Sequence, residues 1–248
     1  MWKWLHPLAN PEVAYRFTGK LTPWFAICSA LLLTIGLVMS LLFSPADYQQ
    51  GESVRIFYLH VPAAMLSMGI YLGMAIAGLC ALVWQFKLAE SSISALAPIG
   101  ATFTAIALLT GAAWGKPMWG TWWIWDARLT SELILLFLYL GVIALQNAFE
   151  DKSLGGKAAS VLALVGVVNL PIIHYSVEWW NTLHQGATVS KFEKPSMSID
   201  MLKPFLFSLF GFAFLAATLV CIRFRAEIIS RNSMRPWVRA LAVAKGNK

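Results

Sequence analysis

"TPWFAICSALLLTIGLVMSLLF" occupies residues 22–43, and no charged side chain interrupts it. A helix needs about 20 mainly apolar residues to cross the hydrocarbon core of a bilayer. Every backbone N–H and C=O group in that core needs a partner within the chain, and a helix provides one for each of them. This stretch therefore predicts a transmembrane helix.

Five further apolar stretches of similar length follow along the chain. They occupy residues 61–85, 94–113, 130–148, 158–176 and 201–222, and the only charges in them, Glu132 and Lys203, lie near span ends. Of the 248 residues, 58% are hydrophobic and 12% are charged, whereas soluble domains carry about 25% charged residues. We therefore expect an all-α membrane protein, in which residues 1–248 form a single domain of six transmembrane helices.

The basic residues indicate how the six spans are oriented. If the N-terminus is inside, 13 Lys and Arg residues fall in the inner segments and 6 in the outer ones. Cytoplasmic segments carry the excess of basic residues, so both termini are expected in the cytoplasm. The outer loops would be 44–60, 114–129 and 177–200. The basic tail 223–248 is best explained as a topology anchor near anionic lipid, and the sequence shows no signature of nucleic-acid binding.

The chain lacks the characteristic residues of several enzyme classes. Cys28, Cys80 and Cys221 all fall within spans, without the spacing of a metal or redox site. The segment "GAAWGKP" at 111–117 lacks the GxxxxGK[ST] spacing of a phosphate loop. No Ser–His–Asp arrangement is suggested either. We therefore expect a binding or transport protein without an ATPase motif of its own, and not an enzyme.

Two histidines, His60 and His184, fall in the predicted outer loops. Neutral imidazole is a common metal ligand, although a single histidine near a span end is more often structural. A zinc site needs a third and often a fourth protein ligand. An iron porphyrin needs only one or two axial ligands, because the macrocycle supplies the other four nitrogens. Two histidines beside an aromatic loop therefore favour haem over a bare ion.

The second outer loop is rich in tryptophan, in "WGTWWIWDARLT" at residues 119–130. Tryptophan is common at any membrane interface. Each of these side chains can bury roughly 150–250 Å², so lipid headgroups, protein or a flat ligand must cover them. If the stretch is helical, its i, i+3, i+4, i+7 spacing puts Trp119, Trp122, Trp123 and Asp126 on one face. That spacing leaves an interfacial belt and a ligand platform equally open.

The residues WGTWWIWD at 119–126 match the pattern WGxxWxWD. This pattern is the signature of the haem-handling membrane proteins of cytochrome c maturation, and the six-span layout of the chain most resembles their haem exporter C branch. The resemblance implies a multi-pass protein of the bacterial inner membrane that holds haem b transiently at the periplasmic face, where the outer loops lie, with His60 and His184 as axial ligands of the iron. It places the cofactor-binding signature at Trp119, Gly120, Trp123, Trp125 and Asp126.

Side-chain chemistry adds details to this expected site. Gly120 would let the backbone approach the haem closely. Arg55 and Arg128 are outer-face candidates for the two propionates, since Arg forks match carboxylates, and contact with lipid is an equally good explanation of them. Asp126 cannot favour propionates, so we expect it to cap a backbone or dock a partner. Trp114 would extend the aromatic platform or belong to an interfacial belt.

The resemblance also implies partners. Haem would pass to a periplasmic haem chaperone, the E component of the maturation system. The chain would work with the ATPase and membrane subunits of an ABC transporter and with a small membrane subunit. Two rival functions are a haem-translocating permease subunit of an ABC complex and a b-type electron-transfer cytochrome. A permease usually has intramembrane charges or interrupted helices, for which Pro98 and Pro171 are candidates, and a transmembrane electron carrier usually needs cofactors near both faces.

Overall fold

The computed structural model describes residues 9–186, 188–189 and 194–246, which are mostly helical. In chain order the elements are α1 (Pro11–Val38), the π-helical turn η2 (Met39–Phe43), the 3-10 turn η3 (Glu52–Ile56), α2 (Phe57–Val83), α3 (Lys87–Trp119), α4 (Ala127–Asn147), α5 (Lys152–Gly166), α6 (Asn169–Trp179), α7 (Ile199–Arg231) and α8 (Pro236–Gly246). Six segments of this part of the chain are long and apolar enough to cross a membrane. The predicted fold class is therefore confirmed.

Most of the helices extend beyond the apolar stretches that predict them. The third stretch covers residues 94–113, whereas α3 runs from Lys87 to Trp119. Part of the predicted basic tail is also helical, because α7 continues to Arg231 and α8 follows it. An apolar window detects only the part of a helix that lies in hydrocarbon, while backbone hydrogen bonds continue the helix into polar surroundings.

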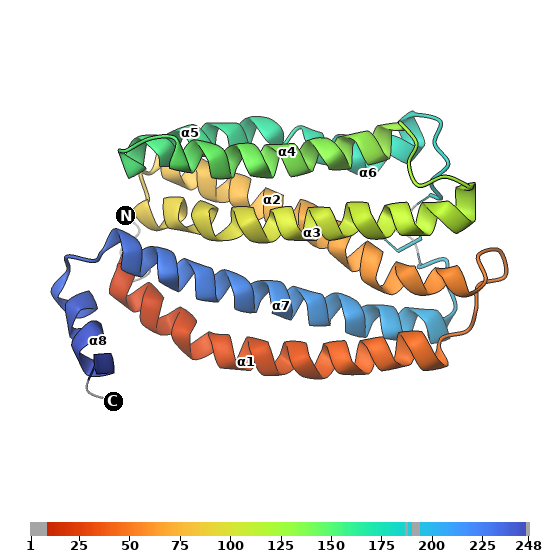
Figure 1. Cartoon of the computed structure of the whole chain (residues 1–248), viewed down its shortest axis with the longest axis horizontal. Helices are drawn as coiled ribbons and strands as arrows, with labels where there is room; N and C mark the ends of the chain where they lie inside the picture. Colours follow the sequence, from red (N-terminus) through yellow and green to blue (C-terminus); the bar gives the residue numbers. More distant parts are fainter. Residues whose placement is uncertain (1–8, 187, 190–193, 247–248) are drawn as a thin grey trace.

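The helices pack in three layers (Figure 1). The first layer pairs α1 with α7, the second pairs α2 with α3, and the third contains α4, α5 and α6. α1 begins and α7 ends at one end of the bundle, which we call the termini end. The connections after α1, α3 and α6 lie at the other, which we call the loop end. The three predicted outer loops therefore share one end of the molecule.

Polar side chains explain where three of the helices begin. Asp126 accepts a hydrogen bond from the Leu129 N–H at 2.8 Å, and Asp151 accepts one from the Ser153 N–H at 2.8 Å. Asn10 caps α1 in the same manner. These caps satisfy N–H groups that have no partner within the helix, and a carboxylate also interacts favourably with the positive end of the helix dipole.

The fifth span consists of two helices, which corrects the single helix expected over residues 158–176. A turn at residues 167–168 separates α5 from α6. Pro171 lacks the N–H that would bond to the carbonyl of Val167, so it favours an interruption at this place. Pro98 was the other candidate for an interrupted helix, but it lies within continuous α3.

Two tyrosines occupy the centre of the bundle. Tyr71 of α2 and Tyr139 of α4 are fully buried, with their ring centroids 5.0 Å apart in an edge-to-face arrangement. The Tyr139 hydroxyl donates to the Ser67 carbonyl at 2.7 Å, which satisfies it in an apolar environment. The Tyr139 ring lies against Gly100 of α3, and the Tyr71 hydroxyl lies against Gly166 of α5, so closely that a Cβ atom at either glycine would overlap it. These contacts hold α2, α3, α4 and α5 together.

Candidate functional site

Most of the predicted site residues lie at the ends of helices and not within loops. The second predicted loop is shortened to residues 120–126 because α3 continues to Trp119. Trp114 and Trp119 therefore belong to the last turns of a helix. His60 lies in the first turns of α2 and Arg128 in the first turn of α4, which corrects their expected places in loops. Helical backbone fixes these four side chains more firmly than a loop would.

The tryptophan stretch is not the one-faced helix that its spacing would allow. Gly120 has a φ of +76°, the left-handed conformation that ends α3, so the residues after it leave the helical spacing. Trp122 and Trp125 are 60% and 77% exposed, whereas Trp123 is half-buried, with its ring centroid 5.4 Å from that of Trp125. A Cβ atom at Gly120 would have no neighbour within 4 Å among the described residues. The glycine is thus required by backbone conformation, and not by crowding within the protein.

His60 directs one ring nitrogen at helix α3. Its Nδ1 atom lies 3.0 Å from the Ala107 carbonyl oxygen and 3.1 Å from the Thr110 hydroxyl. A carbonyl oxygen can only accept, so Nδ1 carries the proton and donates it. The ring also packs edge-on against Trp114, with centroids 5.6 Å apart, and a Cβ atom at Gly111 would lie 3.0 Å from its Cε1 atom. The second ring nitrogen, Nε2, therefore keeps its lone pair, and within the described part of the chain no side chain or backbone group donates to it.

His184 is held in a similar way, by a carboxylate instead of a carbonyl. Its Nδ1 atom lies 2.9 Å from Oδ2 of Asp126, and the Thr182 hydroxyl donates to the same oxygen. The side chains of His184 and Asp126 are 18% and 7% exposed, and the Trp119 ring lies edge-on to the imidazole, 4.7 Å between centroids. The carboxylate accepts, so Nδ1 carries the proton here too, and Nε2 keeps its lone pair without a hydrogen-bond partner among the described residues. Metal-binding histidines commonly donate their other N–H to a carboxylate in this manner.

The electrostatics of this pair favour a neutral imidazole beside an ionised carboxylate. Burial lowers the pKa of His184, and the charge and hydrogen bond of Asp126 offset this only in part. Burial alone would raise the pKa of Asp126, but hydrogen bonds from Thr182 and from the Leu129 N–H, together with His184, lower it below its usual value. Neutral imidazole is the form that binds metals, so His184 is ready to act as a ligand at neutral pH.

The two histidines border the same stretch of α3. His60 contacts it at Gly111 and Trp114, and His184 contacts it one turn further on, at Trp119. The imidazoles are close enough for their charges to interact. In the part of the chain that the structure describes, no group of three His, Cys, Asp or Glu side chains could hold a metal ion. The pair therefore suits a metal that brings most of its own ligands, as an iron porphyrin does.

The two candidate arginines have different surroundings. Arg128 is half-buried, close enough to both histidines for the charges to interact, and its guanidinium forms no hydrogen bond with a described residue. Arg55 instead donates to the Glu52 carboxylate at 2.5 Å and to the Ser40 carbonyl at 2.6 Å. Arg128 is therefore the better candidate for binding a carboxylate, because most of the Arg55 fork is already engaged.

Sequence reasoning missed two residues of this end of the molecule. Gln50 accepts from the Trp114 indole N–H at 3.1 Å and donates to the Gln185 side chain at 3.2 Å, so it links the first loop to α3 and to the third loop. Thr182 orients the carboxylate that holds His184. A threonine two residues before a histidine can accept from its backbone N–H, which the structure shows at 3.1 Å. Thr182 therefore had a local signal, whereas Gln50 had none.

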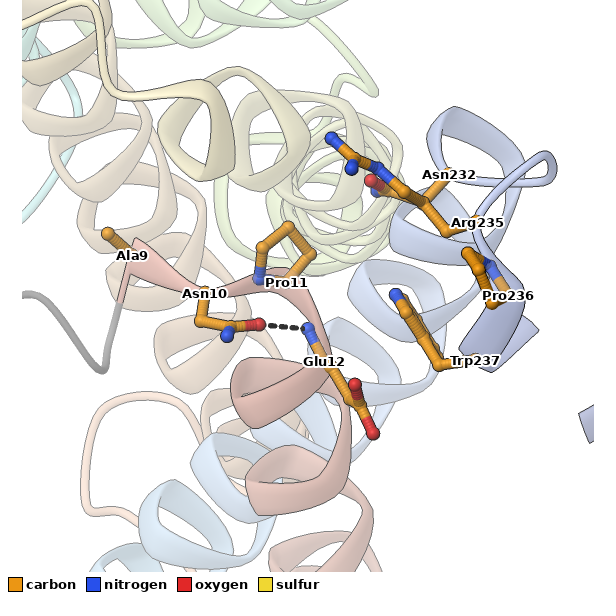
Figure 2. A pocket seen from close by; sticks show the side chains of 8 residues that line it. All are labelled: Ala9, Asn10, Pro11, Glu12, Asn232, Arg235, Pro236 and Trp237. Carbon is orange, nitrogen blue, oxygen red and sulfur yellow. Dashed lines mark hydrogen bonds between the residues drawn. The ribbon is translucent and has the colours of Figure 1, made fainter. Parts of the chain in front are cut away.

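A pocket of about 470 Å³ lies away from this site, at the termini end (Figure 2). It is lined by the start of α1, with Asn10 and Glu12, and by the turn into α8, with Arg235 and Trp237. Figure 2 shows the Asn10 side chain directed at the Glu12 N–H that it caps, so the carboxamide serves the helix start. The predicted site residues all belong to the loop end instead.

Comparison with known proteins identifies the family. The family model described as "Heme exporter protein C" matches residues 4–239. The chain belongs to this family. Proteins named "Heme exporter protein C" from Escherichia coli strain K12 and Haemophilus influenzae are both 59% identical to it, covering 100% and 98%, respectively, of each chain. The one from Bradyrhizobium diazoefficiens is 48% identical over 97% of this chain and 89% of its own length.

Membership of the heme exporter protein C family confirms the resemblance seen in the sequence. The six spans and the family together make the chain a multi-pass inner-membrane protein. The family name describes the export of haem, a handling role and not catalysis. The matched residues include both histidines, the tryptophan stretch and Arg128, so the whole loop-end site lies inside the family match.

Proposed function

We propose that this protein binds haem b at the loop end, which we place at the periplasmic face, with His60 and His184 as the axial ligands of the iron. One observation carries this proposal: both histidines donate through Nδ1 to acceptors inside the protein, and neither Nε2 lone pair accepts a hydrogen bond from a residue that the structure describes. The acceptors, the Ala107 carbonyl and the Asp126 carboxylate, select the tautomer and the ring orientation. Family membership supports haem as the ligand, and the distribution of basic residues supports the periplasmic placement.

The side chains around the histidines suit the rest of the haem molecule. Trp114 and Trp119 provide flat apolar surface beside the two imidazoles. Trp123 has a buried indole N–H without a hydrogen-bond partner among the described residues, and such a donor is costly unless a ligand supplies an acceptor. The half-buried Arg128 guanidinium forms no hydrogen bond with a described residue, although its charge interacts with those of Glu132 and Asp126. The two haem propionates would supply acceptors for both side chains, with Arg128 as the charged partner.

Delivery of the haem would involve the exposed part of the tryptophan stretch. Trp122 and Trp125 project from the loop end with most of their surface uncovered, which suits contact with the periplasmic haem chaperone of the maturation system. ATP hydrolysis would come from a separate subunit of the associated ABC transporter, whose membrane subunit and small membrane subunit complete the complex. The segment 111–117 supports a separate ATPase subunit, because it belongs to helix α3 beside the site. Its Lys116 side chain donates to the Gly120 carbonyl at 2.9 Å.

The optical spectrum of the purified protein, co-expressed with the chaperone, is the first test. The wild type should show a low-spin haem b spectrum, because two imidazoles ligate the iron. His60→Ala and His184→Ala should each alter or abolish it. His174→Ala is the matched control, since this histidine of α6 lies outside the proposed pair, and its spectrum should equal that of the wild type.

Other outcomes would favour other functions. Unchanged haem content in the double variant His60→Ala/His184→Ala would refute the ligand assignment. A haem-free wild type that still loads the chaperone would make the protein a docking scaffold. A permanently bound haem that quinol reduces would indicate a b-type cytochrome, and ATP-driven haem uptake by the reconstituted complex would indicate a permease.

A further inference from the structure

A second pocket at the termini end lies between transmembrane helices, far from the histidine pair. Its volume is about 230 Å³, and its lining comes from α3, α4, α7 and the first residue of α5. α4 and α7 pack against α3 from two sides (Figure 1), so the pocket is a recess over α3 between its two neighbours. Its lining combines apolar residues, among them Pro98 and Ile143, with the charged residues Lys152, Arg223, Glu227 and Arg231.

Two cations of this pocket have no hydrogen-bond or ion-pair partner among the residues that the structure describes. Arg231 is fully engaged, because it donates to Glu227 at 2.5 Å and to Glu90 at 3.1 Å. Lys152 and Arg223 are exposed, and neither side chain forms a hydrogen bond or ion pair with any residue that the structure describes. Glu227 and Glu90 are thus paired with Arg231, and Asp151, next to Lys152, caps α5. Lys152 and Arg223 would therefore attract a negatively charged ligand.

A buried amide at the same pocket also lacks an acceptor. Gln146 lines the pocket, and its Nε2 atom is inaccessible to solvent without a hydrogen-bond partner in the described structure. A buried donor is destabilising until an acceptor reaches it. The ligand that suits Lys152, Arg223 and Gln146 together therefore carries negative charge and several acceptor oxygens, as a phosphate group does.

The surface next to the pocket is apolar and faces the membrane. From the half-buried Pro98 one face of α3 continues through the exposed Thr102 and the half-buried Ile106 to Leu109, at helical spacing. Leu109 is 72% exposed, and the Thr102 hydroxyl is satisfied within the helix by the Pro98 carbonyl at 2.8 Å. This strip, Pro98 to Leu109, offers an acyl chain an apolar path that leads away from the phosphate-binding residues.

We propose that this pocket binds the headgroup of an anionic phospholipid, with an acyl chain along the strip. Basic pockets between transmembrane helices on the cytoplasmic side are known places for such headgroups, and the excess of basic residues assigns the termini end to that side. The lipid would lie where α3, α4 and α7 meet, so it would stabilise the packing of these helices at the end opposite to the haem site.

Lipid binding to the detergent-solubilised full chain tests this proposal. Native mass spectrometry would measure binding of added phosphatidylglycerol and phosphatidylcholine. The pocket variant is Lys152→Gln/Arg223→Gln, and the matched control is Lys87→Gln/Lys157→Gln, which removes the same charge from the same end of the molecule. We expect the wild type and the control to prefer phosphatidylglycerol. The pocket variant should bind it at least about tenfold more weakly, because it lacks two charge-assisted hydrogen bonds.

Additional measurements distinguish the ligand and guard against misfolding. Gln146→Leu should also weaken binding of phosphatidylglycerol, and an unchanged haem spectrum in every variant would show that the fold is intact. Equal binding of phosphatidylglycerol to the pocket and control variants would refute the site. Equal binding of the two lipids by the wild type would refute its selectivity for anionic headgroups. Competition by inorganic phosphate as effective as that by the lipid would refute the role of the acyl strip.

Discussion

Replacing Asp126 with asparagine should weaken haem binding while leaving the fold intact. The carboxylate performs two tasks with two oxygens: Oδ1 caps α4 through the Leu129 N–H at 2.8 Å, and Oδ2 holds the His184 Nδ1–H at 2.9 Å. Asparagine is as good an N-cap as aspartate, so its single oxygen keeps the first task. Its NH₂ group then faces His184 and donates where the carboxylate accepted.

This exchange selects the wrong tautomer of His184. When Nδ1 accepts from the amide, the proton moves to Nε2, the nitrogen that must be free to bind iron. Loss of such a partner of a metal-binding histidine typically lowers metal affinity by about 10–100-fold, which corresponds to about 1.4–2.8 kcal/mol. We expect a loss of haem affinity in this range, with a change in thermal stability no larger than that of a conservative surface substitution.

The assay is a haem titration of the solubilised apoprotein, followed by the absorbance of the low-spin complex, with thermal unfolding measured in parallel. Asp151→Asn is the matched control, because Asp151 caps α5 through the Ser153 N–H at 2.8 Å and lies at the termini end. The control should retain wild-type affinity. An Asp126→Asn protein with wild-type haem affinity, or with lost affinity explained by unfolding, would refute the tautomer argument.

Three further predictions concern the same end of the molecule. Gly111→Ala places a methyl group 3.0 Å from Cε1 of His60, and haem titration should show binding weakened roughly fivefold. This loss corresponds to about 1 kcal/mol, the net contribution of one hydrogen bond to stability. Gly120→Ala should destabilise the protein by about 1–2 kcal/mol in thermal unfolding, because alanine disfavours the φ of +76°. Gly73→Ala is the control for both: it lies in a helix with no neighbour within 4 Å of its Cβ position, and it should not weaken binding or stability. Because burial lowers the pKa of His184, haem retention should be constant through neutral pH and fall only at acidic pH, where protons displace the iron. Loss of haem that begins near pH 7 would contradict the lowered pKa of His184 beside Asp126.

The spans were predictable because membrane insertion depends on a property of the sequence itself. Long apolar stretches such as residues 22–43 have few alternatives to a transmembrane helix. The helix ends were less predictable, since they depend on caps such as Asp126 and on stop signals such as Gly120, which lie outside the apolar stretches that predict the spans. The interruption at Pro171 follows from its missing N–H, yet Pro98 shows that a proline alone does not decide whether a helix continues.

The residues of the candidate site could be named from the sequence, and their role in haem binding stays a prediction, but their geometry could not be anticipated. The tryptophan signature and the two histidines were evident in the sequence, because rare residues cluster there. The orientation of His184 depends on Thr182 and Asp126, which are more than 50 positions apart. The bond between Gln50 and Trp114 likewise joins distant parts of the chain. Contacts of this kind arise only when packing brings the helices together, so no local pattern reports them.

The contacts between buried tyrosines and glycines constrain which substitutions the protein can accept during evolution. The Tyr139 ring occupies the space that a side chain at position 100 would need, and the Tyr71 hydroxyl does the same at position 166. A larger residue at either glycine is compatible only with a smaller partner at the corresponding tyrosine. Among relatives, positions 100 and 139 should therefore change together, as should 71 and 166, and a relative that has lost one member of a pair should have altered the other.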